Sequence, residues 1–381
     1  MKKLTAKISD IFKKGDMVLL ALCVVTTLYG IVMIAATTAE EGTSRYIIIQ
    51  TGTLIFGVLA YLALTAFDID ILAGQRTLLT LFNYVFIGML LIWGVTVGGN
   101  KSWLSFPFLP FNIQPAEVCK IILVIILAKT MSVHQTRISS PKCVVPMTVQ
   151  TLGLVAFYVA ISSDTGVSLI FIFTFLTMAF VGGVSLWWFL AGGGALALAG
   201  PYIWRFVIRD DQKNRILALY DPTIDPTGRH QLWQTNQNLK ALQNGGLAGQ
   251  GLTNGTVTNT TLPASHTDSI FSATGEQLGM VGCLILLALL LAIIVRIIYV
   301  GIKSPDCMNR LICVGIASMF LFQVLINVGV CLGLIPVIGL ALPFFSYGGS
   351  SIITSFLAVG IVSGIKMRPA PDTSAHYIRP Y

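Results

Sequence analysis

Apolar runs long enough to cross a lipid bilayer recur along most of the chain. Crossing about 30 Å of hydrocarbon takes roughly 20 apolar residues of helix. Such runs lie near 17–37, 46–66, 77–97, 114–132, 145–163, 165–183, 185–208, 276–300, 311–333 and 350–367. The pattern predicts an all-α polytopic membrane protein with about ten transmembrane helices.

A long polar segment, 209–270, interrupts the apolar pattern between the seventh and eighth predicted spans. We expect a ten-helix membrane domain over 17–367, preceded by a short segment, 1–16, and followed by a tail, 368–381. A polar loop of this length on one side of a membrane protein is longer than a connection between two helices requires, which indicates a function of its own. We therefore place the chemistry at this loop.

Composition narrows the class of protein and the kind of site. Hydrophobic residues make up 55% of the chain and charged residues 10%, which excludes a soluble domain with a water-facing surface. All seven cysteines lie in or beside apolar spans or on the predicted inner side, and none lies in the long loop. Neither a disulfide framework nor a zinc site is expected.

Basic residues in the short loops set the predicted orientation. With the N-terminus inside, the loops at Arg76, Arg137 and Lys303 are cytoplasmic, whereas the opposite short loops hold only Arg45 and Lys101. Short cytoplasmic loops carry an excess of Lys and Arg, so we predict both termini in the cytoplasm and the long loop outside. The net charge of +8 follows from this topology, and no nucleic-acid partner is expected.

Polar residues gather in four groups on the outer side of this topology. The first includes Lys101 and Trp103, and continues to Pro115, Glu117 and Lys120 at the start of the fourth span. Proline suits a first helical turn, which would place Glu117 and Lys120 on one face. A membrane-interface belt with an ion pair at the helix start is one interpretation. An ionisable pair at that depth is also a functional candidate.

The second group centres on Asp164, between the fifth and sixth spans. Its carboxylate could cap the sixth helix or hold a cation at the mouth of a cavity, and one carboxylate can do both. The fourth group is 342–351, which contains Ser346, Tyr347 and two glycines before the last span. This composition is typical of a broken segment lining a cavity, or of a tight loop with a serine cap.

The third group belongs to the long loop and its borders. Arg205, Arg209 and Arg215 are candidates for holding a lipid-linked phosphate, although such charges often face solvent or headgroups. His266 and Asp268 lie where the chain re-enters the membrane. Partial burial would raise the pKa of such an aspartate, which makes Asp268 a candidate general base.

Taken in order, the short polar sequences resemble those of the SEDS family of bacterial membrane proteins, which includes RodA, FtsW and SpoVE. The resemblance runs from the first span to about Met367. It rests on KSW at 101–103, QPAE at 114–117, DTG at 164–166, HTD at 266–268, NVG at 327–329 and LPFFSYGGSS at 342–351.

The resemblance implies a multi-pass peptidoglycan glycosyltransferase of the bacterial cytoplasmic membrane. Such an enzyme polymerises lipid II beside a class B penicillin-binding transpeptidase, with membrane lipids around it. The position matching Asp268 is the leading catalytic candidate, and the one matching Trp103 is also needed. Glu117, Lys120 and Asp164 are carried over as supporting site residues.

In this chemistry a base accepts the proton of a sugar 4-hydroxyl while undecaprenyl diphosphate leaves. We expect Asp268 to be the base and a divalent cation, Mg or Mn, near Asp164, with no organic cofactor. The expected substrate-binding residues are Lys101, Trp103, Glu117, Lys120, Arg205, Arg209, Arg215, His266, Ser346 and Tyr347.

Three departures from the family pattern surround the candidate base. Ala264 and Gln277 stand where the family commonly has Glu, and Ser269 stands where it often has Phe. These departures leave a specialised or weakly active member, or a non-catalytic scaffold for the transpeptidase, as alternatives. A lipid II flippase is a separate alternative, since it would also have many spans and charges within the membrane. A flippase needs a site near the midplane that is reachable from both sides, whereas the polar groups here collect on one face, which favours the polymerase.

Overall fold

The computed structural model describes residues 13–39, 44–97, 99–107, 109, 111–221 and 223–368. Ten helices coincide with the ten predicted spans: α2 Met17–Thr37, α3 Arg45–Ala66, α5 Arg76–Gly88, α7 Pro115–Val133, α8 Pro141–Ser162, α9 Thr165–Val181, α10 Leu186–Tyr202, α14 Ile270–Lys303, α15 Cys307–Cys331 and α16 Gly349–Met367. Eight helical stretches of the described chain are long and apolar enough to cross a membrane. The predicted all-α polytopic membrane fold is confirmed.

Shorter elements connect these helices. They are α4 Ile69–Gly74, α6 Leu90–Trp93, β1 Gly94–Val97, β2 Asn100–Leu104, the 3₁₀ turn η2 Gln135–Arg137, the π-helical turn η3 Ile203–Val207, α11 Asp210–Ala218, α12 Trp233–Gly245 and α13 Thr256–Thr260. The prediction of a single span over 77–97 was wrong at its end, because the helix stops at Trp93 and the chain enters an antiparallel hairpin. The Val-Thr-Val sequence at 95–97 is apolar, but its β-branched residues favour a strand.

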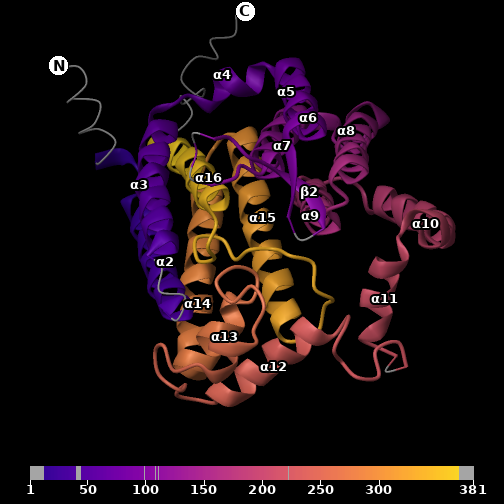
Figure 1. Cartoon of the computed structure of the whole chain (residues 1–381). Coiled ribbons are helices and arrows are strands. Elements are labelled where there is room, and N and C mark those ends of the chain that lie inside the picture. The colour runs from indigo at the N-terminus through magenta and orange to yellow at the C-terminus, as the bar shows by residue number, and fades with distance from the viewer. Residues whose placement is uncertain are drawn as a thin grey trace, which may run out of the picture.

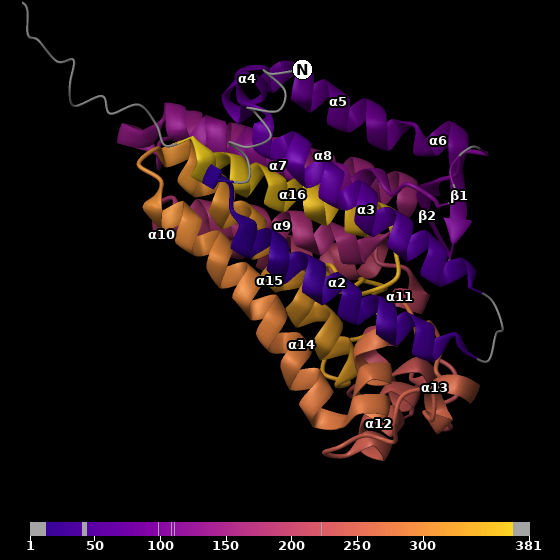
Figure 2. The same cartoon turned by 90° about the vertical axis from the view of Figure 1, so that its left-hand side faces the viewer.

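The bundle has two different ends. We call the end where α2 begins and α16 finishes the terminal end, and the opposite one, which carries α11, α12 and α13, the loop end (Figure 1). Figure 2 shows α3 and α16 running side by side, with the β1–β2 hairpin at the end of α5 and α6 that lies away from α4. The hairpin and the long loop thus belong to the same end of the bundle.

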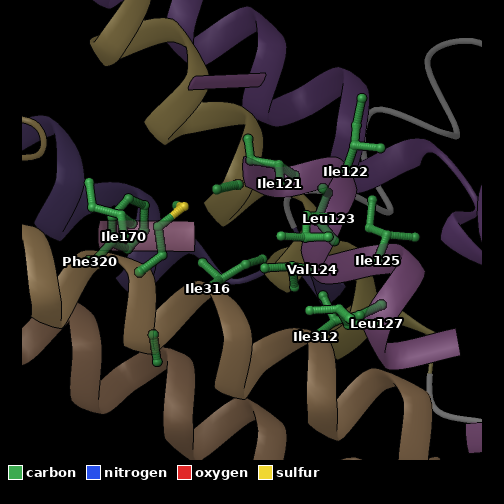
Figure 3. Packing of buried hydrophobic residues seen from close by; sticks show 14 of the residues in the cluster. Ile121, Ile122, Leu123, Val124, Ile125, Leu127, Ile170, Ile312, Ile316 and Phe320 are labelled. Carbon is green, nitrogen blue, oxygen red and sulfur yellow. The ribbon is translucent and has the colours of Figure 1, made fainter. Parts of the chain in front are cut away.

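Helix α7 forms the centre of the apolar core. Figure 3 shows Val124 and Leu127 of α7 next to Ile316 and Ile312 of α15, with Phe320 of α15 beside Ile170 of α9. Nearly all of α7 is buried, which is expected of a helix that is hydrophobic on every side. In contrast, α10 buries none of its residues and stands apart from the bundle in Figure 1.

A charge cluster joins the helices at the terminal end. Asp16, which caps α2, is fully buried and accepts hydrogen bonds from Arg296 Nε at 2.8 Å and Nη2 at 3.0 Å. Lys366 Nζ lies 3.5 Å from the same carboxylate. The Tyr61 hydroxyl donates to the Asp16 carbonyl at 2.7 Å. Helices α2, α3, α14 and α16 are therefore joined through one residue.

Replacing Asp16 by Asn should lower the stability of the purified protein. The change leaves Arg296 and Lys366 without their carboxylate, and we expect a loss of about 1–2 kcal/mol because both cations keep partial contact with water. Thermal unfolding in detergent measures it. Asp68→Asn is the matched control, since Asp68 lies 3.9 Å from Arg368 in a partly exposed pair worth about 0–1 kcal/mol. Equal shifts of the midpoint in the two variants would contradict the role given to Asp16.

Candidate functional site

A cavity of about 950 Å³ lies at the loop end of the bundle. All four polar groups of the sequence contribute to its wall, so their predicted convergence is confirmed. The residues named in the sequence analysis that line it are Trp103, Glu117, Asp164, Arg215, Asp268 and Tyr347. The segment 337–341 and the first turn of α16 complete the wall, and the predicted cavity-lining role of 342–351 is confirmed for Tyr347, Gly348, Gly349 and Ser351.

Asp268 stands two residues before α14, at the end of a tight turn. The Ala264 carbonyl accepts hydrogen bonds from the backbone N–H groups of Thr267 at 3.0 Å and Ser269 at 3.1 Å. Two side chains hold the turn from outside: Ser346 Oγ donates to the Thr267 carbonyl at 2.8 Å, and Asn327 Nδ2 donates to the Asp268 carbonyl at 2.8 Å. The backbone of Asp268 is thus fixed while its side chain lines the cavity.

The electrostatic setting of Asp268 suits proton transfer. Burial raises its pKa to about 6, and the negative charge of Asp164 adds to the effect. A carboxyl group with this pKa is mostly ionised at neutral pH and can still accept and release a proton readily. Asp164 therefore acts electrostatically on the candidate base.

Asp164 both caps a helix and lines the cavity. Its Oδ1 accepts from the Val167 N–H at 3.2 Å, which is the predicted cap of α9. Its Oδ2 accepts from Ser102 Oγ at 3.3 Å, Tyr158 OH at 3.3 Å and Gln114 Nε2 at 3.5 Å. The two interpretations left open by the sequence are compatible, and the carboxylate is well supplied with protein donors.

Glu117 and Lys120 form an ion pair in the first two turns of α7, as predicted. The distance from Lys120 Nζ to Glu117 Oε1 is 2.8 Å. Lys120 is 2% exposed and Glu117 is 7% exposed. Thr354 of α16 donates to the other oxygen of Glu117 at 3.4 Å. Glu117 lines the cavity, whereas Lys120 does not. The charge of Lys120 is directed at Glu117 rather than at the cavity.

Besides Lys120, three predicted substrate-binding cations lie away from the cavity wall: Lys101, Arg205 and Arg209. Lys101 Nζ donates to the carbonyl of Leu91 at 3.0 Å. Arg209 lies 3.3 Å from Asp211 on an exposed surface, and Arg205 belongs to η3. The sequence could not show this, because the direction of a side chain in a loop depends on how the loop packs.

Two other arginines do line the cavity. Arg215 of α11 was predicted, but Arg45, the first residue of α3, was not singled out. Burial and Tyr46 raise the pKa of the Tyr347 phenol, and the charge of Arg45 opposes this shift. The sequence did contain a signal for Arg45, because it is one of only two basic residues in the short loops of the predicted outer side.

An aromatic cluster of Tyr46, His266 and Tyr347 borders the cavity. The ring centroids of Tyr46 and His266 are 4.7 Å apart, and those of Tyr46 and Tyr347 are 5.1 Å apart. Tyr46 and Tyr347 line the cavity, whereas His266 and Ser346 stand behind its wall. The Tyr347 N–H donates to the His266 carbonyl at 2.9 Å, so the cluster supports the turn before Asp268.

Comparison with known proteins identifies the family of the chain. The family model of the FtsW/RodA/SpoVE cell cycle proteins matches residues 16–370. The chain belongs to this family. A probable peptidoglycan glycosyltransferase FtsW from Geobacter metallireducens is 30% identical over 374 residues, covering 93% of this chain and 96% of the relative. Peptidoglycan glycosyltransferase MrdB from Escherichia coli is 29% identical, covering 83% and 84%.

Solved structures of similar proteins have the same fold. A chain from a peptidoglycan synthase complex that coordinates polymerization and crosslinking has a TM-score of 0.76 at 27% identity, covering 92% of this chain and 97% of that one. The rod shape determining protein RodA of Thermus thermophilus has a TM-score of 0.69 at 25% identity, covering 94% and 98%.

The departures from the FtsW/RodA/SpoVE pattern have structural roles here. Ala264 adopts a left-handed conformation with φ 51°. Its carbonyl accepts the hydrogen bond from the Ser269 N–H in the turn before α14. Ser269 Oγ accepts from Gln234 of α12 at 3.1 Å. Gln277 is fully buried, and its Oε1 accepts from the Thr253 N–H at 3.4 Å. Each residue ties Asp268 or α14 to the long loop.

Glu276 anchors the loop to α14. Its carboxylate accepts from the backbone N–H groups of Val257 at 2.9 Å and Thr258 at 2.7 Å, so it caps α13 from a distance in sequence. Gly279 allows close contact nearby, since a Cβ there would lie 2.4 Å from the Leu247 carbonyl oxygen. The loop is thereby held against the helix that follows Asp268.

The sequence analysis missed several cavity residues besides Arg45. Tyr46, His230 and Gln323 also line the wall. Gln323 carried a usable signal, because a polar side chain within the apolar span 311–333 marks a position that packs against protein or water rather than lipid.

Replacing Glu276 by Gln should loosen the loop. An amide NH₂ would face N–H donors that now meet a carboxylate oxygen, so we expect amide hydrogens of 253–262 to exchange about tenfold faster. Hydrogen exchange followed by mass spectrometry measures it. Asp221→Asn, an exposed change in the same loop, should leave this segment unaltered. Unchanged protection in the Glu276 variant would show that the cap does not hold the loop.

Proposed function

We propose that this chain is a peptidoglycan glycosyltransferase that polymerises lipid II into glycan strands. The observation that carries the proposal is the Asp268 side chain, which has a pKa near 6 and lines the loop-end cavity beside Asp164. Membership of the FtsW/RodA/SpoVE family supports it, as does the peptidoglycan glycosyltransferase activity for which its relatives FtsW and MrdB are named.

In the proposed reaction Asp268 is the general base. Its carboxylate accepts the proton of the 4-hydroxyl of one lipid II, and that oxygen forms a bond to the anomeric carbon of the growing strand. The bond from that carbon to the diphosphate breaks, so undecaprenyl diphosphate leaves and the configuration inverts. Trp103 supplies an aromatic wall of the cavity on which a sugar can pack.

The leaving diphosphate needs positive charge. We assign this role to Arg45 and Arg215, which line the cavity, in place of Lys101, Arg205 and Arg209. Guanidinium groups suit phosphate oxygens because their N–H donors match them in pairs. The loop end would face the outside and both termini the cytoplasm, as the distribution of basic residues in short loops favours.

A divalent cation at Asp164 stays a prediction. No group of three or more His, Cys, Asp or Glu side chains that could hold a metal occurs among the residues described. Asp164 already accepts several hydrogen bonds, so the donors fit Mg²⁺ or Mn²⁺ only if phosphate oxygens and water provide most of its ligands. There the cation would neutralise charge on the diphosphate.

A class B penicillin-binding transpeptidase is the proposed partner. The support is the similarity to a chain of a peptidoglycan synthase complex that coordinates polymerization and crosslinking. A glycan strand emerging at the loop end would be available to a crosslinking domain on the same side of the membrane. Membrane lipids would surround the apolar helices.

Asp268→Asn should abolish polymerisation of labelled lipid II by the purified protein. Loss of a general base costs about 10²–10⁴ in rate, and the amide keeps the shape of the side chain. Glycan strands resolved on a gel measure it. Asp221→Asn, in the same loop but exposed, should retain full activity. Arms with a candidate transpeptidase and with EDTA test the partner and the cation.

The result separates the competing functions. Strands made by wild type and lost in the Asp268 variant are the expected outcome. Strands of equal length from both proteins would remove Asp268 from the catalytic role. No strands under any condition, with lipid II crossing liposome membranes instead, would point to a flippase. Neither activity, with the partner still bound, would point to a scaffold.

The rate of polymerisation should depend on pH through Asp268. The base must be ionised, so kcat/KM should fall as pH drops through about 6, the pKa of Asp268. Asp164→Asn removes a negative charge that raises this pKa, and asparagine still caps a helix, so the midpoint should move to lower pH. Rates measured between pH 4.5 and 8 decide it. If the midpoint stayed in place or moved to higher pH, the charge of Asp164 would not raise the pKa of the catalytic base, and the prediction would be wrong.

A further inference from the structure

Gln323 lies where the apolar face of α15 meets the cavity. Ile312, Ile316 and Phe320 form the apolar stripe of this face, next to α7 and α9 (Figure 3). At 3.6 residues per turn, Gln323 and then Asn327 continue the same face toward the loop end. Gln323 lines the cavity wall. The stripe becomes polar at the point where the packed core gives way to open space.

The carboxamide of Gln323 has no protein partner. The residue is only 3% exposed, yet its side chain makes no hydrogen bond to any residue in the described part of the chain. One turn further along, Asn327 Nδ2 donates to the carbonyls of Asp268 and Leu340. The donors and the acceptor of the Gln323 amide are therefore left for water or for a molecule that enters the cavity.

Three other buried polar side chains of the wall have partners within the protein. Glu117 pairs with Lys120, and Asp164 and Gln114 hydrogen-bond each other. Their charges and amides are therefore committed to the fold. Gln323 differs because its donors and its acceptor remain available to a molecule in the cavity.

The chemistry of a carboxamide selects the kind of group that it can bind. It presents two N–H donors and one carbonyl acceptor without charge. Sugar hydroxyl and acetamido groups both donate and accept, whereas a diphosphate only accepts and a polyprenyl chain does neither. We propose that Gln323 hydrogen-bonds the hydroxyl and acetamido groups of an N-acetylated sugar of the lipid-linked substrate. This inference rests on the proposed function, since that function supplies such a sugar.

Binding of two lipids by wild type and Gln323→Met tests the proposal. Methionine matches the length and flexibility of glutamine but cannot form these hydrogen bonds. In nanodiscs, we expect the variant to bind lipid II about tenfold more weakly, which corresponds to the loss of one or two such bonds. Undecaprenyl diphosphate, which has the same tail and phosphates but no sugar, should bind both proteins equally.

Gln50→Met is the matched control for a structural effect. Gln50 of α3 is also a buried glutamine in a membrane helix, but its Nε2 donates to the Ser346 carbonyl at 3.1 Å and its Oε1 accepts from the Gly348 N–H at 3.3 Å. The Gln50 variant should therefore melt at a lower temperature. The Gln323 variant should melt at or above the wild-type temperature, because no protein hydrogen bond is lost.

Each other outcome overturns the inference. Equal loss of affinity for both lipids would indicate a contact to phosphate or general damage to the cavity. Unchanged affinity for lipid II would mean that water alone satisfies Gln323. A lowered melting temperature would indicate a structural role. The proposed function fails separately, if wild type binds lipid II more tightly than undecaprenyl diphosphate but never polymerises it.

Discussion

Inside a bilayer a polypeptide finds no water for its backbone, so irregular segments persist only where protein groups replace that water. The walls of the cavity are irregular in just this way. The Gln50 amide donates to the Ser346 carbonyl and accepts from the Gly348 N–H. The Asn327 amide donates to the carbonyls of Asp268 and Leu340. These buried amides let the chain leave helical geometry near the membrane without exposing its peptide groups to lipid. The position of Asp268 depends on them.

The same requirement explains why charges in the core come in pairs. Glu117 and Lys120 occupy the first turns of α7, most of which is buried, and each charge would be costly alone. Lys120 is paired with Glu117, and the raised pKa of Asp268 has two causes, burial and the negative charge of Asp164. An ionisable base therefore coexists with buried charges a short distance away.

Hydropathy was sufficient to predict the helices, because lipid imposes one length and one polarity on every span. It failed at 94–97, where an apolar stretch is a strand, since hydrophobicity alone does not distinguish the two. The polar groups were predicted to converge because alternating spans return them to one side. Which side chains face the cavity was not predictable: Lys101 turns to Leu91 and Arg45 faces inward through packing that the local sequence does not encode.

The helices differ in how much of the fold they specify. Helix α7 is buried against other helices along most of its length. Within the described part of the chain, α10 buries none of its residues. Substitutions in α7 must preserve shape as well as polarity. Those in α10 need only remain soluble in lipid. A change of side-chain shape in α10 therefore disturbs little packing within this chain, whereas the same change in α7 displaces neighbours on several helices.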